Sequence, residues 1–449
     1  MLQKYNIKKT IYSVGGFLIA SVAYPKDTPN VIIIYTDDHG VLDLGCYGTS
    51  DIVTPNIDGL AEKGTRFTQF YAAPVSSASR ASLLTGQFCR RAGETANSGE
   101  FGLPPEKETL AQRLKIAGYN TAIIGKWHLG SHKTIIPTKR GFDYFWGFLG
   151  GCIDNYSHFY YWGGANKHDL WRNETEVYHP GAFFAEENVK EIKGFIDENN
   201  DKPFFVYWAA NIPHYPYQPS EKWLNYYKAN FPDVKNNRQM YAAFISTLDE
   251  SIGELLTYLK VKGLYDNTVI IFQADNGYSS EDRAFGGGGY NGPYRGCKFS
   301  LFEGGIRVPS IISWPGVLPE GQVIDRMTMN IDWFPTIVEL TGAPKEGMEV
   351  DGKNLIPLIR NKNLPSPHDV LHFDFLDQWA VRKDEWKLIG NPVETKDGNY
   401  RKDLEEKYFL SNVVNDPSEK INYYDQKPEI VKELMTLRDQ YVKSIPQKQ

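Results

Sequence analysis

Short apolar runs alternate with amphipathic stretches along most of this chain. Runs rich in β-branched or aromatic residues, each bounded by Gly, Pro, Asn or Asp, predict strands at residues 31–35, 121–124, 204–208, 269–273 and 308–313. Between them, apolar residues spaced three and four apart predict helices at residues 56–63, 108–117, 184–199 and 240–259. Such alternation is typical of a mostly parallel sheet with helices on both faces.

The pattern changes near residues 344–352. Before this point we expect a large α/β domain, residues 24–350, with a central mixed, mostly parallel sheet between helices. A glycine-rich stretch at 285–296 predicts a loop within it. After it, residues 351–449 predict a smaller α+β domain that contains the stretch 379–389 and a last helix at 429–442.

The N-terminus has the features of a signal peptide. Lys4, Lys8 and Lys9 precede an apolar run at 11–23, and small residues, Ser21 and Ala23, occupy the −3 and −1 positions of a cleavage site. The run is short for a membrane span, and no lipid-accepting Cys follows it. Residues 1–23 therefore predict export to the periplasm or the outside of the cell, without a membrane anchor.

Composition narrows the class of protein further. With 41% hydrophobic and 23% charged residues, a chain of 449 residues can bury a full core. The net charge of −6 argues against a nucleic-acid partner, which would need clustered Lys and Arg. The four cysteines are far apart and form no CxxC pair, so their spacing indicates neither a zinc site nor a disulfide framework.

Polar clusters follow four of the predicted strands directly. They are Asp37-Asp38, Lys126-Trp127-His128, His214 and Asp275-Asn276. Ligands of open α/β sheets bind outside the carboxyl ends of the strands, so we expect these clusters to converge on one site.

The residue types in these clusters indicate a hard cation and an anionic substrate. Asp37, Asp38, Asp275 and Asn276 supply the oxygen ligands that calcium or magnesium prefers, although each pair taken alone could equally form a turn or a helix cap. Arg and Lys bind sulfate or phosphate oxygens and His exchanges protons, which assigns an oxyanion site to Arg80, Lys126, His128, His214 and Lys298. A single Lys or His would more simply be a surface or structural residue, so only the set supports this interpretation.

Ser76 stands just before a short helical pattern. The free N–H groups and the positive dipole of a helix start suit a nucleophile that attacks an anion. The alternative is that Ser76 or Ser77 only caps the helix. A plain serine here also lacks an obvious base.

At these positions the sequence resembles the type I, formylglycine-dependent sulfatases of the alkaline phosphatase superfamily. Their signature is Cys or Ser, any residue, Pro or Ala, any residue, Arg, and then Thr-Gly; here it is Ser76-Ser77-Ala78-Ser79-Arg80 followed by Thr85-Gly86. The similarity continues through Asp37-Asp38-His39-Gly40, the segment 125–130, Pro213-His214, Asp275-Asn276-Gly277 and Lys298 with the segment 303–309.

The resemblance implies a role for each matched position. Ser76 would be converted to formylglycine, whose hydrate supplies the nucleophilic oxygen. Asp37, Asp38, Asp275, Asn276 and modified Ser76 would hold calcium. Arg80 and Lys126 would position the nucleophile and sulfate, His214 and Lys298 would act on the leaving oxygen, and His128 would be the base that later releases sulfate.

Ser76 and Ala78 replace the family's commoner Cys and Pro. Both fit the serine-type branch, which resembles bacterial sulfatases matured by an oxygen-sensitive radical enzyme, so that maturase is an expected partner. Replacement of a native cysteine by serine would leave the same sequence.

The expected substrate is a sulfated saccharide, with galactose or N-acetylgalactosamine sulfate units of polysaccharides as examples. Aromatic and polar residues in 154–173 and in the C-terminal unit predict a sugar-binding role for His168, Trp171, Asp377 and Trp379. The alternatives are a phosphate or phosphonate ester hydrolase of the same superfamily, and a glycan-binding protein without catalysis if Ser76 is never oxidised.

Overall fold

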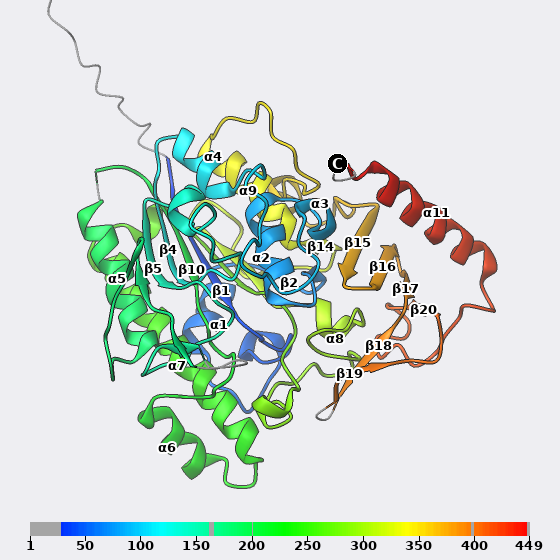
Figure 1. Cartoon of the computed structure of the whole chain (residues 1–449), viewed down its shortest axis with the longest axis horizontal. Helices are drawn as coiled ribbons and strands as arrows, with labels where there is room; N and C mark the ends of the chain where they lie inside the picture. The colour runs from blue at the N-terminus through cyan, green and yellow to red at the C-terminus, as the bar shows by residue number, and fades with distance from the viewer. Residues whose placement is uncertain (1–27, 161–165, 200, 397–398, 447–449) are drawn as a thin grey trace, which may run out of the picture.

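The computed structural model describes residues 28–160, 166–199, 201–396 and 399–446 (Figure 1). The predicted signal peptide, residues 1–23, lies outside the described residues. Within the part that is described, no helix has both the length and the apolar character that a membrane span requires.

A ten-stranded mixed sheet forms the centre of the molecule, in the order β13-β2-β12-β11-β1-β10-β4-β5-β8-β9. Five neighbours, β11 to β5, run parallel, and antiparallel strands flank them on both sides. The bounds are β1 (Asn30–Thr36), β2 (Gly64–Phe67), β4 (Asn120–Lys126), β5 (Tyr144–Phe148), β8 (Trp171–Arg172), β9 (Thr175–Glu176), β10 (Phe204–Ala209), β11 (Thr268–Ala274), β12 (Ser310–Ser313) and β13 (Gln322–Ile324). The predicted mixed, mostly parallel sheet is confirmed.

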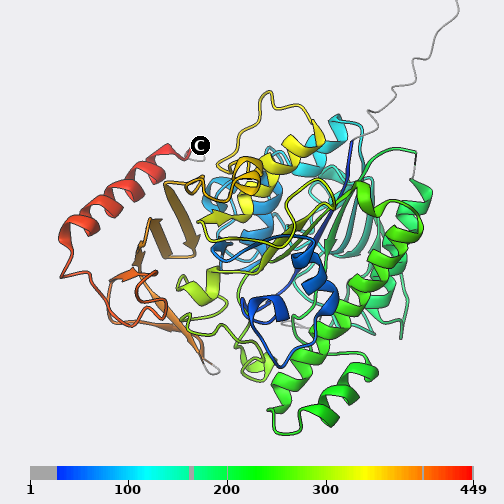
Figure 2. The ribbon, with the colours of Figure 1, turned by 180° about the vertical axis from the view of Figure 1, so that it is seen from behind.

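Both faces of the sheet are covered by helices because the parallel strands are apolar on both sides. In β1, Val31 and Ile33 pack into one core, and Ile32 and Ile34 pack into the other. The first core is covered by α2 (Ser76–Thr85), α4 (Leu110–Ile116), α9 (Trp333–Thr341) and α10 (Ile356–Arg360). The second is covered by α1 (Pro55–Glu62), α5 (Phe184–Glu198) and α7 (Asn236–Val261), with the long α7 nearest the viewer in Figure 2.

The predicted elements differ from the observed ones mainly at their ends. α7 extends beyond the predicted 240–259, and α4 begins at Leu110 because Thr109 forms a capping box with Gln112. The strand predicted at 308–313 begins at Ser310, since Pro309 has no N–H to donate to a neighbouring strand. The predicted loop at 285–296 contains no helix or strand.

The C-terminal unit is an antiparallel sheet covered by one helix. It contains β15 (Val370–Phe375), β16 (Gln378–Lys383), β17 (Trp386–Gly390), β20 (Tyr408–Asn412) and α11 (Pro428–Ser444), the outermost helix in Figure 1. One face of this sheet packs on α11, and the other packs on the segment around α8 (Glu303–Ile306). The predicted α+β character is confirmed, and the predicted boundary at residue 350 stays a prediction.

Shorter elements complete the described chain. Two-residue ladders join β3 (Phe70–Tyr71) to β14 (Thr328–Met329) and β6 (Phe159–Tyr160) to β7 (Lys167–His168), and β18 (Val393–Lys396) pairs with β19 (Asn399–Asp403). The remaining helices are α3 (Cys89–Ala92) and α6 (Glu221–Asn230), with 3-10 turns η1 (Gly45–Tyr47), η2 (Pro137–Lys139), η3 (Tyr265–Asn267), η4 (Asp282–Ala284) and η5 (Asn330–Asp332).

A buried ion cluster joins the two sheets. Lys387 of β17 lies 2.9 Å from Glu303 of α8 and 3.0 Å from Glu419, measured between Nζ and the carboxylate oxygens. All three side chains are fully buried. The C-terminal sheet is thus held against the segment that also carries Lys298.

Candidate active site

The polar clusters at the ends of β1 and β11 meet at one edge of the sheet. The backbone N–H of Asp38 donates to Asp275 Oδ1 over 3.1 Å, and Asn276 Nδ2 donates to Asp38 Oδ1 over 2.8 Å. Lys126, at the end of β4, donates to Asp37 Oδ2 over 2.6 Å. The predicted convergence of the strand ends is confirmed.

Ser76 is the first residue of α2 and faces these carboxylates. Its Oγ donates to Asp37 Oδ1 over 2.9 Å and lies 3.4 Å from Asn276 Oδ1. The N-cap is Val75, whose side chain makes no capping bond, and Ser77 Oγ accepts a hydrogen bond from the Ser98 N–H. The alternative that Ser76 or Ser77 caps the helix is therefore wrong.

Each of the three aspartates has a cationic partner. Besides the Lys126–Asp37 pair, Arg80 lies 2.9 Å from Asp275 and Lys298 lies 2.8 Å from Asp38. Burial opposes ionisation of Asp37, but the charges around it, that of Lys126 first among them, together outweigh burial and hold the pKa of Asp37 far below its usual range. The site is therefore a dense array of buried charges.

The three aspartates and Asn276 together fit a hard divalent cation. Asp37, Asp38, Asp275 and Asn276 are at most 1% exposed and offer only oxygen ligands, as calcium or magnesium requires. Burial raises the pKa of Asp38 to about 6, and burial with the negative charge of Asp37 raises the pKa of Asp275 to about 7. A cation among these residues would stabilise their ionised forms.

His214 approaches the same carboxylates. Its Nδ1–H donates to the Tyr215 carbonyl over 2.6 Å, and its Nε2 lies 3.6 Å from Asp38 Oδ2. Asp37, Asp38 and His214 can place one ligand atom each within 4.8 Å of one another. Because burial lowers the pKa of His214 to about 3, the ring is neutral at physiological pH.

His128 is held in a strained position. Its φ of 51° lies in the left-handed region, as does the φ of 61° at Asp38, and such strain is concentrated at functional sites. Gly151 lies against its ring, because a Cβ there would be 2.9 Å from His128 Nε2. Burial and the nearby charge of Lys126 lower the pKa of His128 well below its ordinary value.

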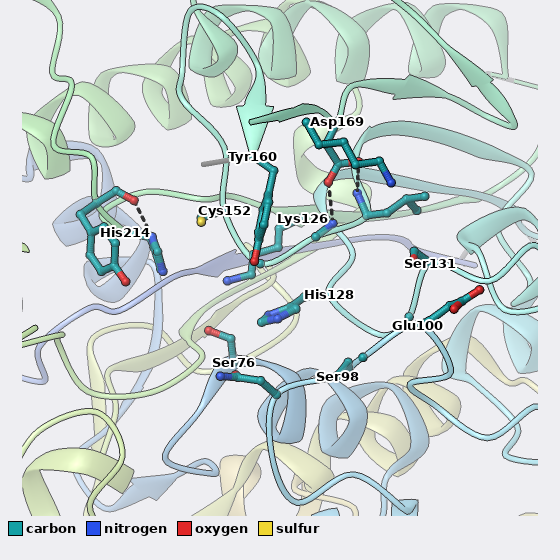
Figure 3. Close-up of a pocket in the computed structure, with 18 of the residues that line it drawn as sticks. Ser76, Ser98, Glu100, Lys126, His128, Ser131, Cys152, Tyr160, Asp169 and His214 are labelled. Atoms are coloured by element: carbon teal, nitrogen blue, oxygen red, sulfur yellow. Dashed lines mark hydrogen bonds between the residues drawn. The ribbon is translucent and has the colours of Figure 1, made fainter. Parts of the chain in front are cut away.

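A pocket of about 700 Å³ opens onto these groups. Ser76, Lys126, His128, His214 and Lys298 all line it. In Figure 3, Ser76, Lys126 and His128 lie near the centre, with His214 to one side and Glu100 and Ser131 to the other. Asp37 and Asp38 lie behind this lining, where they contact Ser76, Lys126 and Lys298, so the pocket wall carries cations and imidazoles backed by carboxylates.

Of the four predicted sugar-binding residues, Trp171 lines this pocket and donates through Nε1 to Asp169 Oδ1 over 2.7 Å. The structure places the other three outside the pocket lining. His168 Nδ1 bonds Glu176, Trp379 packs against Tyr408, and the Asp377 carbonyl accepts a hydrogen bond from Asn391.

Sequence reasoning missed Glu281 and Tyr215 in the pocket wall. Glu281 Oε2 accepts hydrogen bonds from Tyr215 and Ser279, 2.9 Å each, and lies 3.7 Å from Lys298 Nζ. The sequence offers one signal for them, which is that they lie close to predicted site residues. Tyr215 follows His214 directly, and Glu281 comes five positions after Asn276. Glu281 is thus a second carboxylate near the Lys298 cation, besides Asp38.

This fold and this site define an α/β protein whose buried oxygen ligands and cations fit a hard metal ion and an anionic ester. A family model described as Sulfatase matches residues 29–343, and a second, described as N-sulphoglucosamine sulphohydrolase, C-terminal, matches residues 297–445. The chain belongs to the sulfatase family of the alkaline phosphatase superfamily. It is an arylsulfatase-like sulfuric ester hydrolase.

Named relatives agree with this assignment. Mouse arylsulfatase J is 31% identical to this chain over an alignment that covers 93% of this chain and 76% of the relative. Dog N-acetylgalactosamine-6-sulfatase is 32% identical, over 77% of this chain and 68% of the relative. The crystal structure of Ps i-CgsB in complex with k-i-k-neocarrahexaose has a TM-score of 0.81 and 31% identity, covering 92% of each chain.

Proposed function

We propose that this sulfatase removes sulfate from sulfated carbohydrate, with Ser76 oxidised to formylglycine and calcium held by Asp37, Asp38, Asp275 and Asn276. The observation that carries this proposal is the position of Ser76. Its Oγ lies between Asp37 and Asn276, at the floor of the pocket and at the start of α2. An oxygen at this position lies beside the proposed cation ligands and also faces the pocket in which a substrate would bind.

When present, the calcium ion neutralises the carboxylates and polarises a sulfate oxygen, and the hydrated aldehyde supplies the attacking oxygen. Lys126, which lines the pocket, and the buried Arg80 both pair with Asp37 and place positive charge near that oxygen. Because both are buried, their charges act in a region of low dielectric and orient a sulfate group strongly.

The balance of charge favours a sulfate over a phosphate monoester. Arg80, Lys126 and Lys298 carry three positive charges, and the four carboxylates around them are Asp37, Asp38, Asp275 and Glu281. With neutral histidines, a divalent cation leaves one net positive charge. A sulfate monoester carries one negative charge, whereas a phosphate monoester approaches two at pH 7.

His214 and Lys298 lie on one side of the pocket and suit the leaving oxygen. Lys298 can stabilise the departing oxyanion, since Asp38 and Glu281 raise its pKa in spite of burial and so keep it positively charged. His128 lies between Ser76 and the opposite wall in Figure 3, and its neutral ring suits a base that expels sulfate. The ester breaks between sulfur and oxygen in this scheme.

Sulfated galactose or N-acetylgalactosamine units of polysaccharides are the substrates we favour. The N-acetylgalactosamine-6-sulfatase relative and the oligosaccharide complex of Ps i-CgsB support this class. A signal peptide at residues 1–23 would place the enzyme in the periplasm or outside the cell, where such polysaccharides are met. Maturation would require a serine-type radical enzyme.

The test is a peptide mass across Ser76 in protein made with a serine-type maturase, together with sulfate release from 4-nitrophenyl sulfate. We expect the loss of two hydrogens at Ser76 and turnover that a calcium chelator abolishes. Ser82→Ala serves as the matched control for Ser76→Ala on the same helix, because the Ser82 hydroxyl has no hydrogen-bond partner among the described residues, whereas the Ser76 hydroxyl bonds Asp37. An unmodified serine after verified maturation of a control sulfatase would favour a glycan-binding protein, and release of phosphate alone would refute sulfate specificity.

A further inference from the structure

One end of the pocket carries an aromatic pair that the reaction does not use. Phe101 is 71% exposed, and its ring centroid lies 4.7 Å from that of His132, with the ring planes tilted by 34°. The preceding residues, Glu100 and Ser131, line the pocket at the side away from His214 (Figure 3). The pair therefore comes one residue after the pocket lining on each of the two segments.

The two segments that carry the pair are built to lie together. The N–H groups of Ser131 and His132 both donate to the Glu100 carbonyl over 3.0 Å. A Cβ on Gly102 would come within 2.5 Å of the Leu129 carbonyl group, so this close approach requires glycine. The exposed rings thus stand on a fixed backbone rather than on a loose loop end.

The same segment is fixed relative to Ser76. The Ser98 N–H donates to Ser77 Oγ over 2.9 Å, and the Ser98 hydroxyl donates to Glu94 over 2.6 Å. Ser77 is the neighbour of Ser76 on α2. One hydrogen bond therefore sets the distance between the reacting position and the wall that leads to Phe101.

The chemistry of this wall suits a sugar. Asn97, Ser98, Glu100 and Ser131 offer hydrogen-bonding groups along the pocket. Beyond them, the exposed ring faces offer the apolar, partly negative surface on which the C–H face of a sugar ring packs. Large exposed aromatic surface of this kind, continuous with a pocket, indicates a binding site.

We propose that Phe101 and His132 form a subsite for a second sugar ring of the substrate, next to the ring that carries the sulfate. This proposal rests on the proposed carbohydrate sulfatase function. It makes a sulfated oligosaccharide or polysaccharide, rather than a free sulfated monosaccharide, the preferred substrate.

The test uses two sulfated hexasaccharides, from carrageenan and from chondroitin sulfate, and the sulfated monosaccharide that each contains. Matured wild type and Phe101→Ala are compared by kcat/KM, and protein with unmodified Ser76 is compared by calorimetric binding. The control is Tyr226→Ala, which removes another aromatic side chain, on α6, outside the pocket lining.

We expect Phe101→Ala to lower the ratio of hexasaccharide to monosaccharide kcat/KM about tenfold, mainly through KM, and to weaken hexasaccharide binding about tenfold, as loss of one aromatic contact predicts. Tyr226→Ala keeps both values. An unchanged ratio, or turnover confined to the monosaccharides, would overturn the subsite. So would a wild-type dimer that Phe101→Ala dissociates in light scattering, because a second copy would then cover the pair.

The two proposals fail separately. If matured wild type releases no sulfate from any ester, the proposed function fails, and binding to the Ser76 protein still decides the subsite. If sulfate is released but Phe101→Ala binds the hexasaccharides like wild type, only the subsite fails.

Discussion

Replacing Gly151 by alanine would displace the His128 imidazole through a single added methyl group. The backbone at Gly151 has an ordinary φ, so alanine fits the chain itself, but the new Cβ would lie 2.9 Å from Nε2 and 3.0 Å from Cε1 of His128. Ordinary contact begins near 3.4 Å, so the ring must move by about 0.5 Å. His128 is half-buried and lines the pocket, so the pocket is the open space into which the displaced ring can move.

The size of the effect follows from the precision that catalytic groups need. Displacements of about 0.5–1 Å cost roughly 10- to 100-fold in rate, or about 1.4–2.7 kcal/mol of barrier. We therefore expect kcat on 4-nitrophenyl sulfate to fall about 10- to 100-fold in Gly151→Ala. KM should change less, because the Lys126 and Arg80 pairs with Asp37 and Asp275 are untouched.

The assay compares sulfate release and thermal unfolding of matured Gly151→Ala with those of Gly194→Ala. Gly194 lies in α5, and a Cβ added there would have no atom within 4 Å outside its own helix backbone, so alanine should keep the activity and keep or slightly raise the melting temperature. Wild-type kcat in Gly151→Ala, or a loss of activity that only follows a loss of folded protein, would refute the argument that Gly151 positions His128.

Three further predictions concern the cation, the buried cluster and pH. Asp275→Asn removes a charged ligand, so calcium affinity measured by calorimetry should fall at least about tenfold. Lys387→Ala removes the cation that Glu303 and Glu419 share and leaves Glu303 with Arg307, so the free energy of unfolding in urea should fall by about 3–5 kcal/mol. Burial lowers the pKa of His372 to about 3, below its usual 6.5, so it stabilises the fold above pH 6.5 and this stabilisation is lost as pH falls toward 3. Between pH 6.5 and 4, the free energy of unfolding should therefore fall less in His372→Phe than in wild type. The difference between the two proteins should grow by at most about 1.4 kcal/mol per pH unit.

A separate outcome would refute each of these three predictions. Calcium binding equal to wild type in Asp275→Asn would remove Asp275 from the cation site. Lys383→Ala, which breaks an exposed pair with Glu433, should lower the free energy of unfolding far less, and an equal loss in the two variants would mean that the burial of Lys387 contributes nothing. Identical pH slopes for wild type and His372→Phe would show that His372 titrates normally in the fold.

Much of the fold was readable from the sequence because its signals are local. Apolar residues at every position of 31–35 require burial on both faces, and the structure divides them between two helix-covered cores. Spacings of three and four likewise located α5 and α11 to within two residues at each end. Strand order and the antiparallel edges were not readable, since they depend on contacts between distant segments.

The reacting end of the pocket was also readable, because its residues follow strands that must end at one edge of the sheet. The tertiary structure alone decided which neighbours join them. It brought Glu281 beside Lys298 and tied Ser98 to Ser77, while His168 and Trp379 received other partners outside the pocket lining.

The sequence by itself determined the chemical identity of the site, because strand, helix start and motif are properties of short segments. Only the tertiary structure shows which residues form the pocket wall around the reacting atoms. The wall from Asn97 to Phe101 has no periodicity or charge pattern of its own. It becomes a part of the pocket because Gly102 lets two loops approach within hydrogen-bonding distance, and such a contact has no signal in either segment alone.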